Sequence, residues 1–160
     1  MITNKNIYPY VLVLVLFFNA SIGFSQNTTR LEQAKENIHL VAELSEIPDK
    51  KNTVEVLYKL HFPLWIGLKN FTFLDIPEYQ KFKKEDFGIA SYEPITEEYK
   101  GSKSRYVILR RFHLYTKNVK PSDIEPTTIQ LVIELPTEER DSLGTRIYEL
   151  VPIELTSRTN

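Results

Sequence analysis

Hydrophobic and polar residues alternate with a period of two over most of the chain beyond residue 37. The apolar members of the three clearest segments are Ile38, Leu40, Ala42 and Leu44, then Val54, Val56, Tyr58, Leu60 and Phe62, and finally Ile129, Leu131, Ile133 and Leu135. Successive side chains of a β-strand point to opposite faces of its sheet, so this period is typical of half-buried strands. The pattern predicts an all-β fold whose core contains these apolar side chains.

Clusters of turn-forming residues separate the alternating segments. They lie at 48–52, 77–78, 100–104, 120–123 and 141–144, and each contains a proline or a glycine. Such residues favour tight connections and interrupt regular structure. Several short strands joined at this spacing are typical of an antiparallel β-sandwich.

The segment Arg105–Thr116 is the longest strand candidate, but its alternation changes parity halfway. The apolar pairs on the two parities are Val107 with Leu109 and Phe112 with Leu114. A β-bulge near Arg110-Arg111 would turn both pairs toward one face, because an extra residue resets the alternation. The turn at Gly101 then predicts a hairpin between 95–99 and this strand.

Two other segments are less regular. Thr29–Glu32 has the spacing of a capping box and predicts either a short helix through Asn37 or a flexible leader. The charged segment Phe82–Phe87 is interpreted as a loop that leads into a strand near Phe87–Tyr92.

The N-terminus has the features of an export signal. Tyr10–Phe18 is an unbroken apolar run of nine residues behind Lys5, and Gly23 and Ser25 occupy the −3 and −1 positions of a cleavage site before Gln26. A membrane-spanning helix needs about 20 apolar residues. The sequence therefore predicts a cleaved signal peptide and a periplasmic or envelope-associated product, which contacts the membrane only before cleavage.

The alternative is an inner-membrane anchor formed by residues 8–24. In either case the length of 160 residues fits a single folded domain. The expected organisation is a signal peptide at 1–25, a leader or short helix at 26–36, a β-sandwich at 37–156 and a tail at 157–160.

Composition and motifs exclude several kinds of chemistry. The net charge of −1 argues against a general nucleic-acid binder, and the absence of cysteine excludes disulfides, thiolate metal sites and a thiol nucleophile. No nucleophile elbow or phosphate-binding glycine loop is present. The histidines at polar strand positions, His39, His61 and His113, are interpreted as solvent-facing or hydrogen-bonded. The sequence predicts a non-enzymatic protein without catalytic residues, cofactor or metal.

Five segments, in order, resemble the BatD family, the oxygen-tolerance proteins of the Bacteroides aerotolerance operon. They are Lys51–Val56, Phe71–Tyr79, Glu98–Tyr115, Ile124–Leu131 and Tyr148–Leu155. The most specific is Glu98–Tyr115, where a glycine turn precedes an Arg-Tyr step and a Leu-Arg-Arg-aromatic run. One departure is Lys51-Asn52-Thr53, which stands where the family usually has Gly-Glu-Pro.

The resemblance covers roughly residues 37–156 and implies the first immunoglobulin-like domain of such a protein. Full-length members of the family continue into further domains and a membrane-spanning helix, so membrane tethering is not transferred to this sequence. The resemblance implies partners in the cell envelope, including von Willebrand A-type proteins of the same operon, in aerotolerance-associated complexes.

Arginine and tyrosine concentrate in the predicted hairpin, and both residue types are enriched in protein interfaces. The predicted interface residues are Lys103, Arg105, Arg110, Arg111 and Tyr115. Arg110 has an alternative role as an inward, structural residue paired with a carboxylate. An alternative function is an extracytoplasmic carbohydrate- or ligand-binding sandwich. Its stacking platform would comprise Trp65, Tyr58, Phe71 and Tyr79, for which the favoured interpretation is a place in the buried core.

Overall fold

The computed structural model describes residues 29–89, 93–116 and 118–159. Contacts divide the chain into two units, Met1–Gln33 and Ala34–Asn160, which are considered separately. Residues 29–37 are helical, the first of the two alternatives for this segment. No helix within the described part of the chain is long and apolar enough to cross a membrane. The predicted signal peptide lies outside the described residues.

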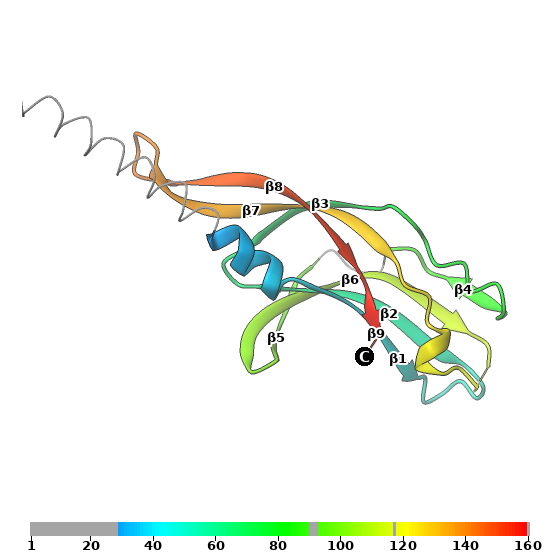
Figure 1. Ribbon diagram of the computed structural model, residues 1–160. Helices are drawn as coiled ribbons and strands as arrows, with labels where there is room; N and C mark the ends of the chain where they lie inside the picture. Colours follow the sequence, from blue (N-terminus) through cyan, green and yellow to red (C-terminus); the bar gives the residue numbers. More distant parts are fainter. Residues whose placement is uncertain (1–28, 90–92, 117, 160) are drawn as a thin grey trace, which may run out of the picture. The chain divides into compact units, whose positions relative to one another are not determined.

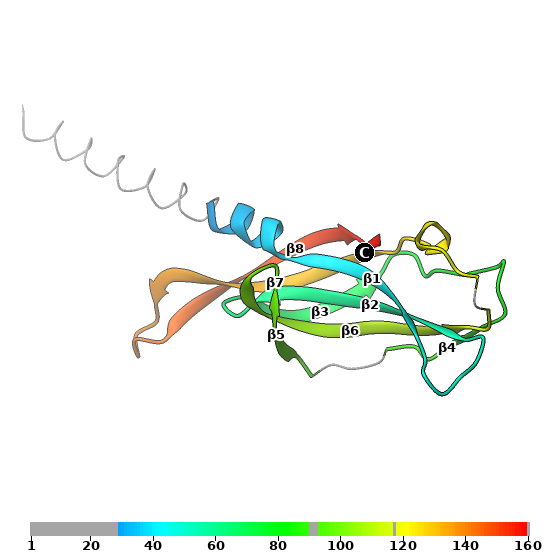
Figure 2. The same cartoon turned by 90° about the horizontal axis from the view of Figure 1, so that it is seen from below.

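All described strands lie in the second unit and form two sheets. The larger sheet contains β1 (His39–Glu46), β2 (Val54–Pro63), β4 (Lys84–Asp86), β5 (Ile95–Tyr99), β6 (Ser102–Leu114) and β9 (Arg158–Thr159), and the smaller contains β3 (Gly67–Phe73), β7 (Thr128–Arg140) and β8 (Arg146–Thr156). A 3-10 helix, Pro121–Asp123, precedes β7. Figures 1 and 2 show the two sheets as stacked layers, so the predicted all-β sandwich is confirmed.

The strand order of the larger sheet is β4-β6-β2-β1-β9, and β5 also pairs with β6. The smaller sheet has the order β3-β7-β8. Neighbouring strands are antiparallel except β1 and β9, which are parallel. The chain thus passes from β8 in one sheet to β9 in the other, and the predicted tail at 157–160 contributes an edge strand.

The core contains the apolar side chains that the alternation predicts. The expected inward residues Val54, Val56, Tyr58, Leu60, Ile129, Leu131 and Ile133 are all buried. Leu40 and Ala42 of β1 are paired with Leu60 and Tyr58 of β2, so their buried side chains lie on the same face of the sheet. The predicted parity of these strands is therefore correct.

The bulge predicted in β6 is also confirmed. The register with β2 shifts between Tyr58 and Lys59, whose partners are Arg110 and Ile108, so Leu109 is the extra residue. The four apolar residues Val107, Leu109, Phe112 and Leu114 are buried as a result. The bulge lets one long strand bury its large side chains against the core at both ends.

The predicted hairpin joins β5 and β6 through Lys100 and Gly101. Their φ angles are 50° and 77°, and a two-residue turn of type I′ needs left-handed values at both positions. The expected loop over Phe82–Phe87 is wrong, because Lys84–Asp86 forms β4 along the C-terminal end of β6. Residues 87–89 lie outside any strand, and the remainder of the strand expected near Phe87–Tyr92 lies outside the described residues.

Candidate functional site

The five residues of the predicted interface are spread along β6. Lys103 lies near its start and Tyr115 directly follows its end. The chain is extended over the twelve residue steps from one to the other, and strands rise about 3.3 Å per residue, so the row is roughly 40 Å long. The structure therefore does not bring the five side chains into one compact patch, and their role in binding stays a prediction.

Arg105 is bound to the backbone of the chain itself. Its Nη2 donates to the carbonyl oxygens of Leu64 at 3.1 Å and Ile66 at 2.6 Å. Its guanidinium also lies 5.0 Å from the ring centre of Phe62. These contacts stabilise the turn between β2 and β3, so Arg105 has a structural role.

Arg110 points inward and is paired with a carboxylate, as in the alternative structural role that the sequence left open for it. Its Nη2 lies 2.5 Å from Oδ2 of Asp86, and its guanidinium lies 5.5 Å from the rings of both Phe73 and Phe112. Burial alone would raise the pKa of Asp86, but hydrogen bonds from Arg110 and from the Gly88 backbone lower that pKa overall. Because Phe73 belongs to the smaller sheet, Arg110 joins β4, β6 and β3.

The remaining aromatic and basic members of the row have acidic neighbours. Arg111 Nε lies 3.2 Å from Oε1 of Glu55, and the hydroxyl of Tyr115 donates to Oε2 of Glu85 at 2.6 Å. Both pairs are at the surface, where such contacts exchange readily with water or with a partner. Lys103 and Tyr115 are the exposed members of the row, whereas Arg111 is half-buried.

His61 lies on the outer face of the larger sheet, yet only 1% of it is exposed. The ring of Tyr99, from the β5–β6 hairpin, stacks on it with centroids 4.0 Å apart, and Glu97 Oε1 lies 3.0 Å from its Nδ1. Burial lowers the pKa of His61 to about 4, so the ring is neutral near pH 7. Of the two expectations for this side chain, solvent-facing or hydrogen-bonded, the first does not hold for His61, because the hairpin covers it and brings Glu97 to its Nδ1.

Across the described residues, no three side chains of the metal-ligating types gather in a way that could hold a metal ion. His39 and His61 are paired across β1 and β2, whereas His113 lies near the opposite end of the sheet. Nε2 of His113 instead lies 3.5 Å from Oε1 of Glu55.

The expected stacking platform is not assembled. Tyr58 and Tyr79 are buried, and their hydroxyl oxygens lie 2.6 Å apart. Of the four side chains, Trp65 is exposed and Phe71 is half-buried. Tyr58 and Tyr79 thus have the buried core role that was the other interpretation of these residues, and the wider alternative of a ligand-binding sandwich stays a prediction.

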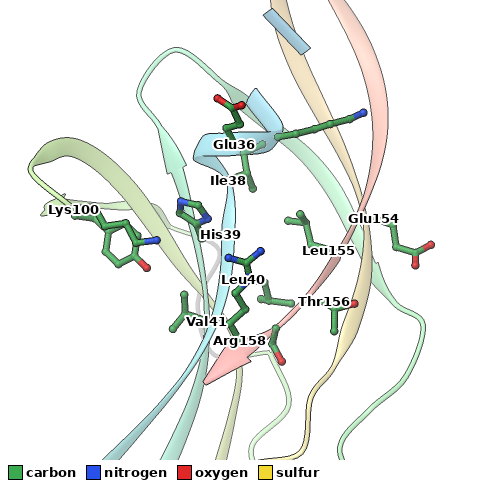
Figure 3. A pocket seen from close by; sticks show the side chains of 13 residues that line it. Glu36, Ile38, His39, Leu40, Val41, Lys100, Glu154, Leu155, Thr156 and Arg158 are labelled. Carbon is green, nitrogen blue, oxygen red and sulfur yellow. The ribbon is translucent and has the colours of Figure 1, made fainter. Parts of the chain in front are cut away.

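A pocket of about 560 Å³ lies beside the covered His61, between β1, the β5–β6 turn and the crossing from β8 to β9. Figure 3 shows the nitrogen-bearing ends of His39, Lys100 and Arg158 on its near side, directed toward one another. The carboxylates of Glu36 and Glu154 point outward from this group. Burial, followed by the charges of Lys100 and Arg158, lowers the pKa of His39.

An apolar surface covers the outer face of the β7–β8 hairpin. This outer-face patch consists of Val132, Pro136, Tyr148, Leu150 and Pro152, in which Pro136 pairs with Tyr148 and Val132 with Pro152. Tyr148 is 53% exposed and Leu150 is 55% exposed. Because β3 pairs with β7 only as far as Glu134, the distal half of the hairpin has no third strand beside it. Figure 1 shows the hairpin turn beyond the end of β3.

The sequence carried a signal for this surface that the alternation analysis did not use. Ile147–Ile153 is apolar on both parities, apart from Glu149, whereas a strand with one solvated face should alternate. The inward-facing residues of β8 include the buried Ile153, and its outward-facing residues belong to the patch. A strand that is apolar on both faces needs a second surface packed against its outer face.

Comparisons with protein-family models, with curated proteins and with solved structures gave no match.

Proposed function

We propose that this chain is a non-enzymatic protein-binding domain and that the outer-face patch is its contact surface. The observation that carries the proposal is the run of exposed Tyr148, Leu150 and Pro152 along one face of a single strand. Contiguous apolar surface of this kind marks interaction sites in soluble proteins. Tyrosine adds a large, rigid contact area with a polar end.

The charge around the patch indicates the chemistry of the partner. Residues 128–156 contain six acidic and two basic residues, so the hairpin is negative although the whole chain is nearly neutral. Glu134 and Glu154 lie on the same face as the patch. A partner segment with apolar side chains flanked by lysine or arginine would complement this surface.

The strand order supports an immunoglobulin-like form of the sandwich. The β1, β2 and β6 strands with β4 or β5 correspond to strands A, B, E and D of a constant-type domain. Strands β3, β7 and β8 correspond to C, F and G. In such domains, exposed sheet faces and loops carry binding, which suits the proposed role.

The proposal includes a place of action in the cell envelope. Its support is the apolar run Tyr10–Phe18 with the small residues before Gln26, and the five segments that resemble the BatD family. The partner would then be an exported or membrane-bound protein, and von Willebrand A-type proteins are the candidates that the resemblance implies.

Site-specific photocrosslinking tests the proposal. A photoreactive p-benzoylphenylalanine replaces Tyr148 in one version of the protein and Lys103 in another, because Lys103 is also exposed but lies on the larger sheet. The proposal expects a discrete crosslinked protein from position 148, which weakens as salt is raised. Crosslinking from position 103 alone would place the interface on the sequence-predicted row instead.

Matched variants separate contact from folding. Leu150→Ser removes an exposed apolar side chain and should abolish the crosslink from position 148 while the melting temperature changes little. Lys103→Ala with Arg111→Ala should leave that crosslink unchanged. If Leu150→Ser retains the crosslink at full yield, the outer-face patch is not the contact surface.

A further inference from the structure

The pocket described above contains cationic groups that the fold does not neutralise. Neither Lys100 nor Arg158 forms an ion pair with any carboxylate of the described residues. The ammonium of Lys100 lies 5.3 Å from the ring centre of Tyr99, which leaves its hydrogen-bond donors unused. The side chains of Lys100 and Arg158 are both exposed, so an anion from solution can reach them, and an anion that contacts both gains Coulomb attraction from each.

Three distant parts of the sequence supply these groups. His39 begins β1, Lys100 occupies the β5–β6 turn, and Arg158 is paired with Val41 in the parallel strand β9. Because His39 and Val41 share one face of β1, the guanidinium and the imidazole lie on the same side of the sheet. Figure 3 shows both directed into the pocket, with Lys100 opposite.

The electrostatics of His39 agree with this arrangement. Burial is the main cause of its lowered pKa, and Lys100 and Arg158 contribute further in the same direction. The imidazole is therefore neutral near pH 7 and offers one N–H donor beside two full positive charges. A neutral donor and two cations form a suitable set for a single anionic group.

We propose that this pocket binds the carboxylate or phosphate group of a small organic anion. Arg158 provides a planar fork of donors, Lys100 a mobile charge and His39 a neutral donor. The ring of Tyr99, 5.9 Å from that of His39, also lines the pocket, so the body of the ligand meets an aromatic surface while its charged group meets the cations. A volume of about 560 Å³ is sufficient for a molecule of the size of a sugar acid. This binding role goes beyond the proposed protein interface, which is the outer face of the β7–β8 hairpin, although Glu154 of β8 borders both sites.

Calorimetric titration of the purified protein tests the proposal with three matched probes. Glucuronate and glucose 6-phosphate each carry an anionic group on a glucose-like body, and glucose itself is the neutral control. We expect at least one of the anions to bind about tenfold or more tightly than glucose, which corresponds to one good charge-assisted contact. Equal or absent binding of all three probes would overturn the proposal.

Variants distinguish a specific pocket from general positive charge. Lys100→Asn removes the charge and keeps a residue type that tolerates the left-handed φ of 50° at this position. Arg158→Gln removes the fork, and Lys103→Gln removes a nearby exposed charge that does not line the pocket. We expect about a tenfold loss of anion affinity for each of the first two and none for Lys103→Gln.

Two results would contradict this assignment. If Lys103→Gln weakens binding as much as Lys100→Asn does, the anion responds to the general charge of the hairpin. If Lys100→Asn folds and binds like the wild type, Lys100 has no role in the pocket. The melting temperature of each variant is measured alongside, and Lys100→Asn keeps the test decisive should Arg158→Gln disturb β9.

Discussion

Two tyrosine hydroxyls connect the larger sheet to the segments that cross its end. Tyr58 donates to the backbone oxygen of Glu125 at 2.5 Å, so its own oxygen is left to accept from the hydroxyl of Tyr79 at 2.6 Å. Burial raises the pKa of Tyr79 to about 12, and burial also raises that of Tyr58. Both phenols therefore remain protonated and can donate at every physiological pH.

Tyr79 reaches this position through an unusual backbone conformation. Its φ is 46°, in the left-handed region that bulky residues rarely adopt. Such a conformation persists only where surrounding contacts favour it. The hydroxyl pair with Tyr58 and the edge-on contact with Phe112, at 5.2 Å between ring centres, provide those contacts.

Replacing Tyr58 by phenylalanine should lower the free energy of unfolding by about 1–3 kcal/mol. The variant keeps the ring but leaves the Glu125 carbonyl and the Tyr79 hydroxyl without their buried partner. Urea unfolding measures the difference. Tyr106→Phe is the matched control, because Tyr106 contacts His61 and Lys59 through its ring. A loss of equal size in both variants would show that the buried hydroxyl pair contributes nothing specific.

Stability should also fall as the solution is acidified from pH 6.5 toward pH 4. The pKa of His61 is about 4 in the folded chain against 6.5 when unperturbed, so the unfolded chain takes up a proton first. Protonation then favours unfolding, and the full stability is present only above pH 6.5. The lowered pKa of His39 acts in the same direction. The carboxylate of Glu43 opposes the shift without reversing it.

The measurement is the unfolding free energy at pH 7 and at pH 5, for the wild type and for His61→Phe. Phenylalanine can keep the stack on Tyr99 but cannot be protonated. We expect the variant to lose less stability between the two pH values than the wild type loses. An unchanged difference would mean that His61 is not the group responsible.

At the scale of strands, the sequence predicted those elements whose burial follows from their own pattern. β1, β2, β7 and the bulged β6 were expected because each carries enough alternating apolar residues to define an inner face. β4 was not, since Lys84-Glu85-Asp86 contains no apolar residue and forms a strand only because β6 offers an edge. A strand that depends on its neighbour in this way has no signature of its own.

The parity of β7 can be tested with a pair of leucines. Leu131→Ala removes a side chain that is 1% exposed and should cost about 2–5 kcal/mol of unfolding free energy. Leu150→Ala makes the same chemical change on the outer face of β8 and should cost less than about 0.5 kcal/mol. Chemical denaturation of both variants gives the comparison. Similar losses would imply that Leu150 is covered in solution, for instance by a second copy of the chain.

At the scale of the whole molecule, near-neutrality conceals a separation of charge. Residues 81–120 contain ten basic and five acidic residues, whereas residues 128–156 contain two basic and six acidic ones. The first stretch contains β5 and β6 of the larger sheet, and the second contains the β7–β8 hairpin of the smaller. The pocket takes Lys100 from the first stretch and the outer-face patch lies on the second, so one domain offers an anionic ligand and a basic protein segment different surfaces.

The pocket was not predicted from the sequence, and the reason is geometric. The pocket joins His39, Lys100 and Arg158, and only the parallel pairing of β9 with β1 brings the last of these near the first. The predicted interface residues along β6 do not form one compact patch, for a related reason. Arg105 and Arg110 are bound to Leu64, Ile66 and Asp86, contacts that depend on the turn after β2 and on β4. Clustering of arginine in a sequence does not reveal these internal partners.

The last prediction concerns the form in which the whole molecule functions. Export with cleavage before Gln26 would leave residues 34–160, the unit that holds every described strand, intact. Mass spectrometry of the protein produced in a Gram-negative host should find a periplasmic species that begins at or within a few residues of Gln26. Small side chains are needed at the −3 and −1 positions, so Gly23→Lys with Ser25→Lys should block processing. A full-length wild-type species that stays in the inner membrane would show instead that residues 8–24 act as an anchor, and the proposed contacts would then form at the membrane surface.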